Sequence, residues 1–131
     1  MQQVLWSEEY AVGNEQIDSQ HKSLFEILNK LRISISNKQE KRYIDKNIME
    51  LQHYTVMHFS AEELYMSDAM YKNMDKHILQ HDFFTGKIKE LDPANDSNSV
   101  DTKIELLEFL TEWLFNHVLT EDKKAASFIL T

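Results

Sequence analysis

The sequence predicts an all-α fold: an up-down-up-down four-helix bundle with an irregular N-terminal arm and a short C-terminal helix. Three observations predict it. The 131 residues include only two glycines and one proline, which helices avoid and which β-rich proteins use at their turns. Four segments repeat apolar residues at alternating spacings of three and four, which places them on one face of a helix. Short links join these segments, so consecutive helices should run antiparallel.

The four apolar stripes define the predicted helices, and they run over residues 17–35, 44–65, 74–91 and 104–117. Short polar links at 36–39 and 71–73 separate the first three stripes. The longest link, at 92–99, holds the only proline. The whole chain, 1–131, is expected to form a single domain, since this length suffices for one core.

Outside the stripes, residues 1–16 are expected to form the irregular arm, with a bend at Gly13, and residues 121–130 the short final helix. The formal net charge of −8 disfavours binding to nucleic acids and to anionic membranes. No apolar run approaches the roughly 20 residues of a membrane helix, and the first ten residues do not resemble a signal peptide. The absence of cysteine excludes disulfides, thiolate metal sites and iron–sulfur clusters. A monomeric, cytoplasmic protein is expected.

Each stripe contains a histidine at a position where a leucine would be expected. A single histidine on such a face is usually a core residue with an ordinary hydrogen bond. Five such histidines with few polar partners would destabilise the fold, because each unsatisfied buried group costs on the order of 1–3 kcal/mol and a domain is only marginally stable. We therefore interpret five histidines as metal ligands: His21, His58, His77, His81 and His117.

These histidines are also predicted to lie at one height in the bundle. His21 precedes the centre of the first link by about 17 residues and His58 follows it by about 20, which gives similar heights in an antiparallel pair of helices. His77 and His81 precede the long link by about 15 and 11 residues, and His117 follows it by about 17. All five therefore fall in one slab of the bundle.

Two carboxylates are candidates to join the histidines. Glu62 lies four residues after His58 and therefore on the same helical face. Asp122 lies five residues after His117, which on an ideal helix turns it away by roughly 140°. Two interpretations of Asp122 stay open. Either the fourth helix ends near residue 119 or 120 and a turn returns the side chain to the site, or Asp122 is a solvated aspartate beside two lysines.

Motifs around these residues extend over nearly the whole chain. They are Ile17-Asp18-Ser19-Gln20-His21 with Leu24-Phe25, His58-Phe59-Ser60-Ala61-Glu62-Glu63, His77-Ile78-Leu79-Gln80-His81 with Phe84, and Trp113-Leu114-Phe115-Asn116-His117 before Asp122, with Trp6 and Gly13 in the arm. Each motif is weak alone, but together and in this order they are specific. On these motifs the chain resembles the hemerythrins, especially the single-domain bacterial members.

The resemblance implies a non-haem di-iron centre, in which two Fe²⁺/Fe³⁺ ions share a bridging oxo or hydroxo group. It also implies the metal ligands: His77, His81 and His117 for one iron, His21 and His58 for the other, and Glu62 and Asp122 as bridges between them. For Asp122 the resemblance favours the ligand role that geometry leaves open.

Counting these ligands leaves one open position, because the iron with three histidines has six ligands and the iron with two has five. The net charge of the site stays the same when a bridging hydroxide gives its proton to dioxygen, so a buried pocket needs no protons from solvent. The resemblance implies reversible dioxygen binding, as hydroperoxide on the five-coordinate iron, and no catalysis. Transport, storage and delivery to an oxygen-using enzyme all fit this chemistry.

Apolar neighbours of the ligands are expected to line the dioxygen pocket and exclude water: Leu24, Phe59, Trp113, Leu114 and Val118. Two alternatives stay open, namely an oxygen or redox sensor module that signals to a partner protein, and a di-iron oxidase or peroxidase. Ferritin-like enzymes of the second kind use Glu-x-x-His pairs, of which only Glu50-x-x-His53 fits, off the core stripe. Both His53 and Glu63 are expected on the solvated surface.

Overall fold

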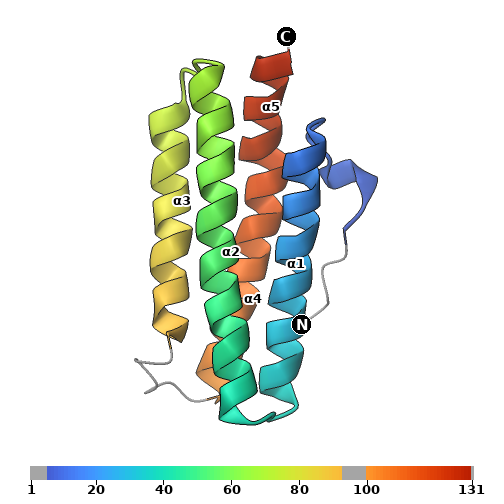
Figure 1. The fold of residues 1–131 in the computed structure, drawn as a ribbon, viewed down its shortest axis with the longest axis vertical. Helices are drawn as coiled ribbons and strands as arrows, with labels where there is room; N and C mark the ends of the chain where they lie inside the picture. The colour runs from blue at the N-terminus through green and yellow to red at the C-terminus, as the bar shows by residue number, and fades with distance from the viewer. Residues whose placement is uncertain (1–5, 93–99, 131) are drawn as a thin grey trace.

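The computed structural model describes residues 6–92 and 100–130, most of which are helical. The helix bounds are Glu15–Ser36 for α1, Lys41–Asp68 for α2, Met74–Ile88 for α3, Val100–His117 for α4 and Lys123–Leu130 for α5. Helices α1 to α4 run alternately in opposite directions, and α5 continues the direction of α4 (Figure 1). No strand occurs in the described residues. The predicted four-helix bundle and its short C-terminal helix are confirmed.

The core lies between the four long helices. Helix α1 packs against α2 and α4, and α3 packs against α2 and α4 from the other side. Fully buried leucine, isoleucine and phenylalanine side chains, each contributing about 1.5–3 kcal/mol by leaving water, come from all four: Leu24, Phe25, Leu28, Leu31, Ile48, Leu51, Phe84, Leu107 and Leu110. Among the described helices none is long and apolar enough to cross a bilayer.

The first two links are tight turns with a left-handed residue, Lys38 with a φ of 53° and Met70 with a φ of 54°. The amide of the following residue, Gln39 or Tyr71, donates back to a carbonyl of the last helical turn at 3.1 and 3.0 Å. This is the Schellman pattern, which closes a helix end without a longer loop. It makes consecutive helices antiparallel neighbours. The third predicted link lies almost wholly in residues 93–99, outside the described part of the chain.

Between residue 6 and the start of α1, the N-terminal arm is irregular apart from one 3-10 turn, Glu8–Tyr10. Tyr10 is buried and packs on Phe25 and Phe115, with ring centroids 6.0 and 5.2 Å apart. Gly13 has a φ of 90°, a left-handed conformation that glycine adopts without strain. The predicted bend is therefore present, and it turns the arm into the start of α1.

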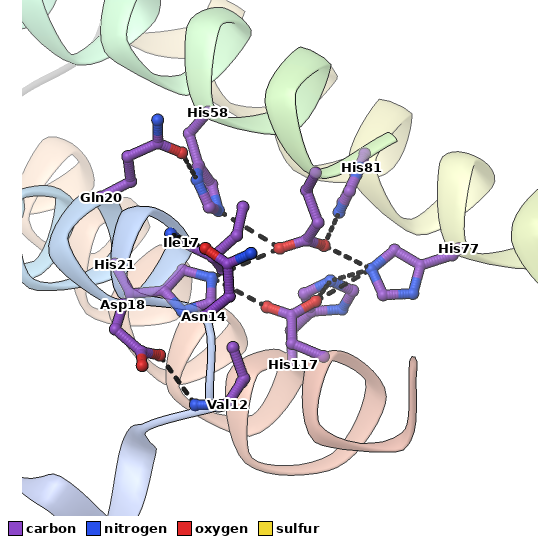
Figure 2. Close-up of polar contacts among 12 residues, drawn as sticks. Val12, Asn14, Ile17, Asp18, Gln20, His21, His58, His77, His81 and His117 are labelled. Atoms are coloured by element: carbon purple, nitrogen blue, oxygen red, sulfur yellow. Dashed lines mark hydrogen bonds and ion pairs between the residues drawn. The ribbon is translucent and has the colours of Figure 1, made fainter. Parts of the chain in front are cut away.

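Hydrogen bonds then fix the first turn of α1 (Figure 2). The side chain of Asn14, the residue before the helix, accepts a hydrogen bond from the amide of Ile17 at 3.0 Å. Asp18 Oδ1 accepts one from the amide of Val12 at 2.7 Å, which ties the arm to the helix. Both bonds lie about one turn before His21, so they stabilise the backbone that positions this side chain.

Candidate metal centre

Five histidines and two carboxylates meet inside the bundle, and the five histidine side chains point toward a common centre (Figure 2). None is more than 4% exposed. They are contributed by α1 (His21), α2 (His58 and Glu62), α3 (His77 and His81), α4 (His117) and the turn after α4 (Asp122). Their nitrogen and oxygen atoms form two overlapping groups that could each hold a metal ion: Glu62, His77, His81, His117 and Asp122 in one, and His21, His58 and Glu62 in the other.

Glu62 lies between the two histidine groups and presents one oxygen to each. Its Oε1 is 2.7 Å from His77 Nε2 and 3.1 Å from His81 Nε2. Its Oε2 is 3.4 Å from His21 Nε2 and 3.5 Å from His58 Nε2. A carboxylate in this position can bridge two cations that lie close together.

Asp122 repeats this arrangement with its own two oxygens. Its Oδ1 is 2.9 Å from His77 Nε2 and 3.1 Å from His117 Nε2, and its Oδ2 is 3.1 Å from His21 Nε2. Both carboxylates therefore offer one oxygen to the group of three histidines and one to the group of two.

The backbone that brings Asp122 into the cluster differs from the predicted turn. The helical rod does not end near residue 119 or 120, because the chain continues after His117 as a π-helical turn, Val118–Asp122, and then as α5. A π-helix pairs residues five apart instead of four, so it brings the fifth residue after His117 back to the same face. The predicted turn was wrong. Asp122 nevertheless lies in the cluster, and at 4% exposure it is not a solvated aspartate.

The cluster fits a pair of cations, because its polar atoms are poorly satisfied by one another. Among the described residues, six buried atoms of the cluster have no hydrogen-bond partner: Nδ1 and Nε2 of His21, His58 Nε2, His77 Nδ1, Glu62 Oε2 and Asp122 Oδ1. The Nε2 atoms of His77 and His117 face each other at 3.1 Å, which a shared proton or a bound cation can satisfy. Each unsatisfied buried polar atom costs on the order of 1–3 kcal/mol. Imidazole and carboxylate donors without thiolate suit non-haem iron.

Before an ion binds, protons must balance the charges of the cluster. Burial alone would lower the pKa of His21 and of His77, but the adjacent carboxylates of Asp122 and Glu62 outweigh it and raise both pKa values to about 9. At His58 burial prevails and lowers the pKa. Burial would raise the pKa of each carboxyl group, but the surrounding histidines hold both pKa values below the ordinary range. Metal binding must therefore displace protons from the histidines.

Two of the histidines have hydrogen-bond partners outside the predicted ligand set. His58 Nδ1 donates to Gln20 Oε1 at 2.8 Å, and His81 Nδ1 donates to Glu63 Oε2 at 2.9 Å. The prediction that Glu63 is a solvated surface residue missed this contact: 29% of its side chain is exposed, and its carboxylate bonds a buried histidine. Periodicity placed Glu63 about 100° away from Glu62, but it did not show that a histidine of α3 occupies that side. Gln20 was missed as well, although it belongs to the first motif.

Apolar packing surrounds the cluster. Phe59 stacks on His81 with ring centroids 3.8 Å apart, and Trp113 stacks on His117 at 4.6 Å. Trp113 and His117 also border a surface cleft of about 230 Å³. The five side chains predicted to line a dioxygen pocket belong to the hydrophobic core, Trp113 as a partly buried member: Leu24, Phe59, Trp113, Leu114 and Val118.

The residues expected for a carboxylate-rich oxidase site lie elsewhere. Glu50 and His53 are both exposed on α2, and Glu50 Oε2 lies 3.7 Å from Lys30 Nζ. His53 is on the surface as predicted, so the Glu-x-x-His pair contributes nothing to the buried cluster.

Known proteins share this sequence pattern and fold. Residues 12–129 match the family described as the hemerythrin HHE cation binding domain. The bacteriohemerythrin of Clostridium acetobutylicum is 34% identical over 127 residues, which cover 92% of this chain and 96% of that protein. The bacteriohemerythrin of Methylococcus capsulatus is 32% identical over 108 residues, which cover 81% and 80%. A crystal structure of wild-type hemerythrin aligns over 98% of both chains with a TM-score of 0.83 and 26% identity.

Proposed function

Since the chain belongs to the hemerythrin family, we propose that it binds dioxygen reversibly at a pair of iron ions held by its buried cluster. The observation that supports this most directly is the division of the ligand atoms. Two carboxylates offer one oxygen each to a group of three histidines and to a group of two. One ion would therefore have one protein ligand fewer than the other, and metals that bind substrates keep such an open position.

The proposal gives each side chain of the cluster a role. The ligands would be His77, His81 and His117 for one ion, His21 and His58 for the ion with the open position, and Glu62 and Asp122 as bridges beside an oxo or hydroxo group. When bound, the ions supply the two electrons that reduce dioxygen reversibly to the level of peroxide. The protein contributes the position of the ions, a closed environment and the outer hydrogen bonds of two histidines.

The residues around the cluster favour binding over turnover. Leu24, Leu114 and Val118 are at most 1% exposed and carry no proton donor, so they exclude water and offer no general acid. We therefore propose a carrier, store or donor of dioxygen and not an enzyme. The monomeric state, a cytoplasmic location and delivery to an oxygen-using enzyme stay predictions.

Iron content and the visible spectrum test this function. The protein is loaded with ferrous iron under argon, exposed to air and returned to argon. We expect two iron ions per chain and an absorption band that appears with dioxygen and disappears without it. His58→Ala should lose the reversible band, whereas His53→Ala, at an exposed histidine of the same helix, should keep it.

Three results would contradict the proposal in different ways. Iron well below two ions per chain would remove the di-iron centre. Rapid consumption of peroxide with a reducing substrate would favour an oxidase or peroxidase. A partner protein that binds only one iron oxidation state, together with a band that does not reverse, would favour the sensor.

A further inference from the structure

The two histidine groups differ in the charge of the side chain that accepts a hydrogen bond from an Nδ1 atom of the group. Behind His81, in the group of three, Glu63 is a carboxylate. Behind His58, in the group of two, Gln20 is a neutral amide. The two hydrogen bonds are almost equal in length, 2.9 and 2.8 Å. The structure therefore presents a matched pair that differs mainly in charge.

Both bonds determine which ring nitrogen is free for a metal. A carboxylate only accepts hydrogen bonds, so the proton must sit on His81 Nδ1, and the Nε2 lone pair points into the cluster. The amide oxygen of Gln20 does the same for His58. By contrast, the Nδ1 atoms of His21 and His77 are buried without a hydrogen-bond partner in the described residues. The described hydrogen bonds thus give one ring in each group an outer side-chain partner, His81 in the group of three and His58 in the group of two.

The carboxylate also makes its histidine a stronger ligand. A negative charge on the Nδ1–H side raises the basicity of Nε2. The side chain of His81 is 1% exposed and Phe59 covers its face at 3.8 Å, so water screens this interaction little. The carboxylate itself keeps contact with water, since 29% of its side chain is exposed, so little desolvation opposes its charge.

We propose that Glu63 is a positioning residue that makes the two metal positions unequal, with Gln20 as its uncharged counterpart. The inference rests on the proposed di-iron function. The ion at the group of three histidines is held more tightly and gives up an electron more readily than the ion at the group of two. His81, the stronger ligand, thus binds the ion without the open position. There it favours release of an electron and leaves the ligands of the dioxygen-binding ion unchanged.

Four variants of the full chain test this inference. Glu63→Gln keeps the acceptor and removes the charge, Glu63→Ala removes both, and Gln20→Glu adds a charge behind His58. Glu105→Gln, at an exposed glutamate of α4, is the control. Iron-loaded protein is mixed under argon with an excess of a ferrous chelator, and iron release is followed with time.

Wild-type protein is expected to release iron in a fast and a slow phase. Glu63→Gln should accelerate the slow phase about 10–100-fold, the range found for outer partners of metal-bound histidines. Glu63→Ala should do so at least as strongly, and Gln20→Glu should slow the fast phase. The Glu105→Gln control should leave both phases unchanged.

Two further measurements separate charge from structure. In a titration with ferricyanide, which takes one electron from a ferrous ion and leaves a ferric ion, Glu63→Gln should show a higher midpoint potential than the wild type. In zinc-loaded protein, the Nδ1–H proton resonance of His81 should persist in Glu63→Gln and be lost in Glu63→Ala. Melting temperatures show whether each variant is folded.

The outcomes distinguish this inference from the proposed function. Equal iron release and equal potentials in wild type and Glu63→Gln overturn the inference and leave the di-iron function intact. If the wild type binds no iron, the proposed function fails. Zinc release then decides the inference: dependence on Glu63 supports it, and a rate that does not depend on Glu63 overturns it.

Discussion

The two halves of this bundle differ in the side chains that they bury. Toward the link between α1 and α2 the interior is mainly apolar, with Leu31, Ile35, Ile48 and Leu51 at most 1% exposed and one buried polar pair, Ser34 and Asn47. Toward the link between α2 and α3 the same helices bury seven polar side chains, none more than 4% exposed. Both halves are equally closed to water, so burial alone does not distinguish them.

This difference shows that one part of the bundle can stabilise the fold while another part holds the metal ligands. Each fully buried side chain of the apolar half contributes about 1.5–3 kcal/mol, whatever the pH or the metal supply. The cluster contributes to stability only when protons or ions satisfy its polar atoms, because buried unpaired charges are unfavourable. The apolar half can therefore hold the helices in register while the other half keeps its ligand atoms facing one another.

The largest effect should follow from removing Glu62, whose oxygens lie near four of the five histidines. Glu62→Ala takes one oxygen from each ion position, so the affinity for both ions should fall. The loss of affinity should exceed the roughly 10–100-fold that follows from changing an outer partner of a metal-bound histidine. Elemental analysis after iron loading measures this. Glu112→Ala, at an exposed glutamate of α4, should retain both ions. Full iron content in Glu62→Ala would show that the cluster is not the metal site.

Substituting one leucine in each half compares the two halves directly. Leu51 is fully buried in the apolar half, and Leu114 is 1% exposed and lies one turn before His117. Either leucine replaced by alanine should lower the free energy of unfolding by about 2–5 kcal/mol, through lost contacts and a residual cavity. Denaturant titration measures this loss. Only Leu114→Ala should also shorten the autoxidation half-life in air, because its cavity admits water beside the cluster. Equal half-lives in the two variants would contradict the proposed shielding.

The pH dependence of stability should come from the cluster half alone. In protein stripped of metal, the pKa values of His21 and His77 are raised to about 9 from 6.5. Groups with raised pKa values stabilise the fold fully below their unfolded pKa, and this contribution disappears as the pH rises through the folded pKa. The stripped protein should therefore lose on the order of 1–3 kcal/mol between pH 6.5 and pH 9.

Thermal melts across this pH range measure the effect, and the metal-loaded protein is the control. Its histidines bind as neutral ligands, so its melting temperature should change little over the same interval. A stripped protein whose melting temperature is flat from pH 6.5 to beyond pH 9 would show that His21 and His77 are not protonated in the cluster.

Most of the frame and the depth of the cluster could be predicted from the sequence, because both depend on regular geometry. An apolar stripe defines the inner face of a helix, and a rise of about 1.5 Å per residue gives the height of each histidine. The path to Asp122 could not be predicted in this way. A π-helical turn shifts the backbone hydrogen bonds by one residue, and no side chain between His117 and Asp122 signals that shift.

The outer partners of the histidines show a second limit. Periodicity indicates the direction of Glu63 on α2. Its hydrogen bond with His81 also depends on how α3 is rotated and how far away it lies, and the sequence of α2 does not determine either. The same holds for Gln20, which reaches from α1 to His58 on α2. Ligands that converge on one centre can be recognised from spacing, whereas contacts between two helix flanks require the structure.

The smallest predicted effect compares the links at the two ends of the bundle. Lys38, at the apolar end, and Met70, at the cluster end, share the left-handed conformation, with φ values of 53° and 54°. Glycine adopts this conformation without the roughly 1–2 kcal/mol penalty of other residues, although its unfolded chain is more flexible. Lys38→Gly and Met70→Gly should each raise the free energy of unfolding by about 0.5–1 kcal/mol. Denaturant titration should give the same gain in stripped and metal-loaded protein, because the strain is local to each link. A gain at Met70 that appears only after metal removal would instead show that the cluster already holds the second link in place.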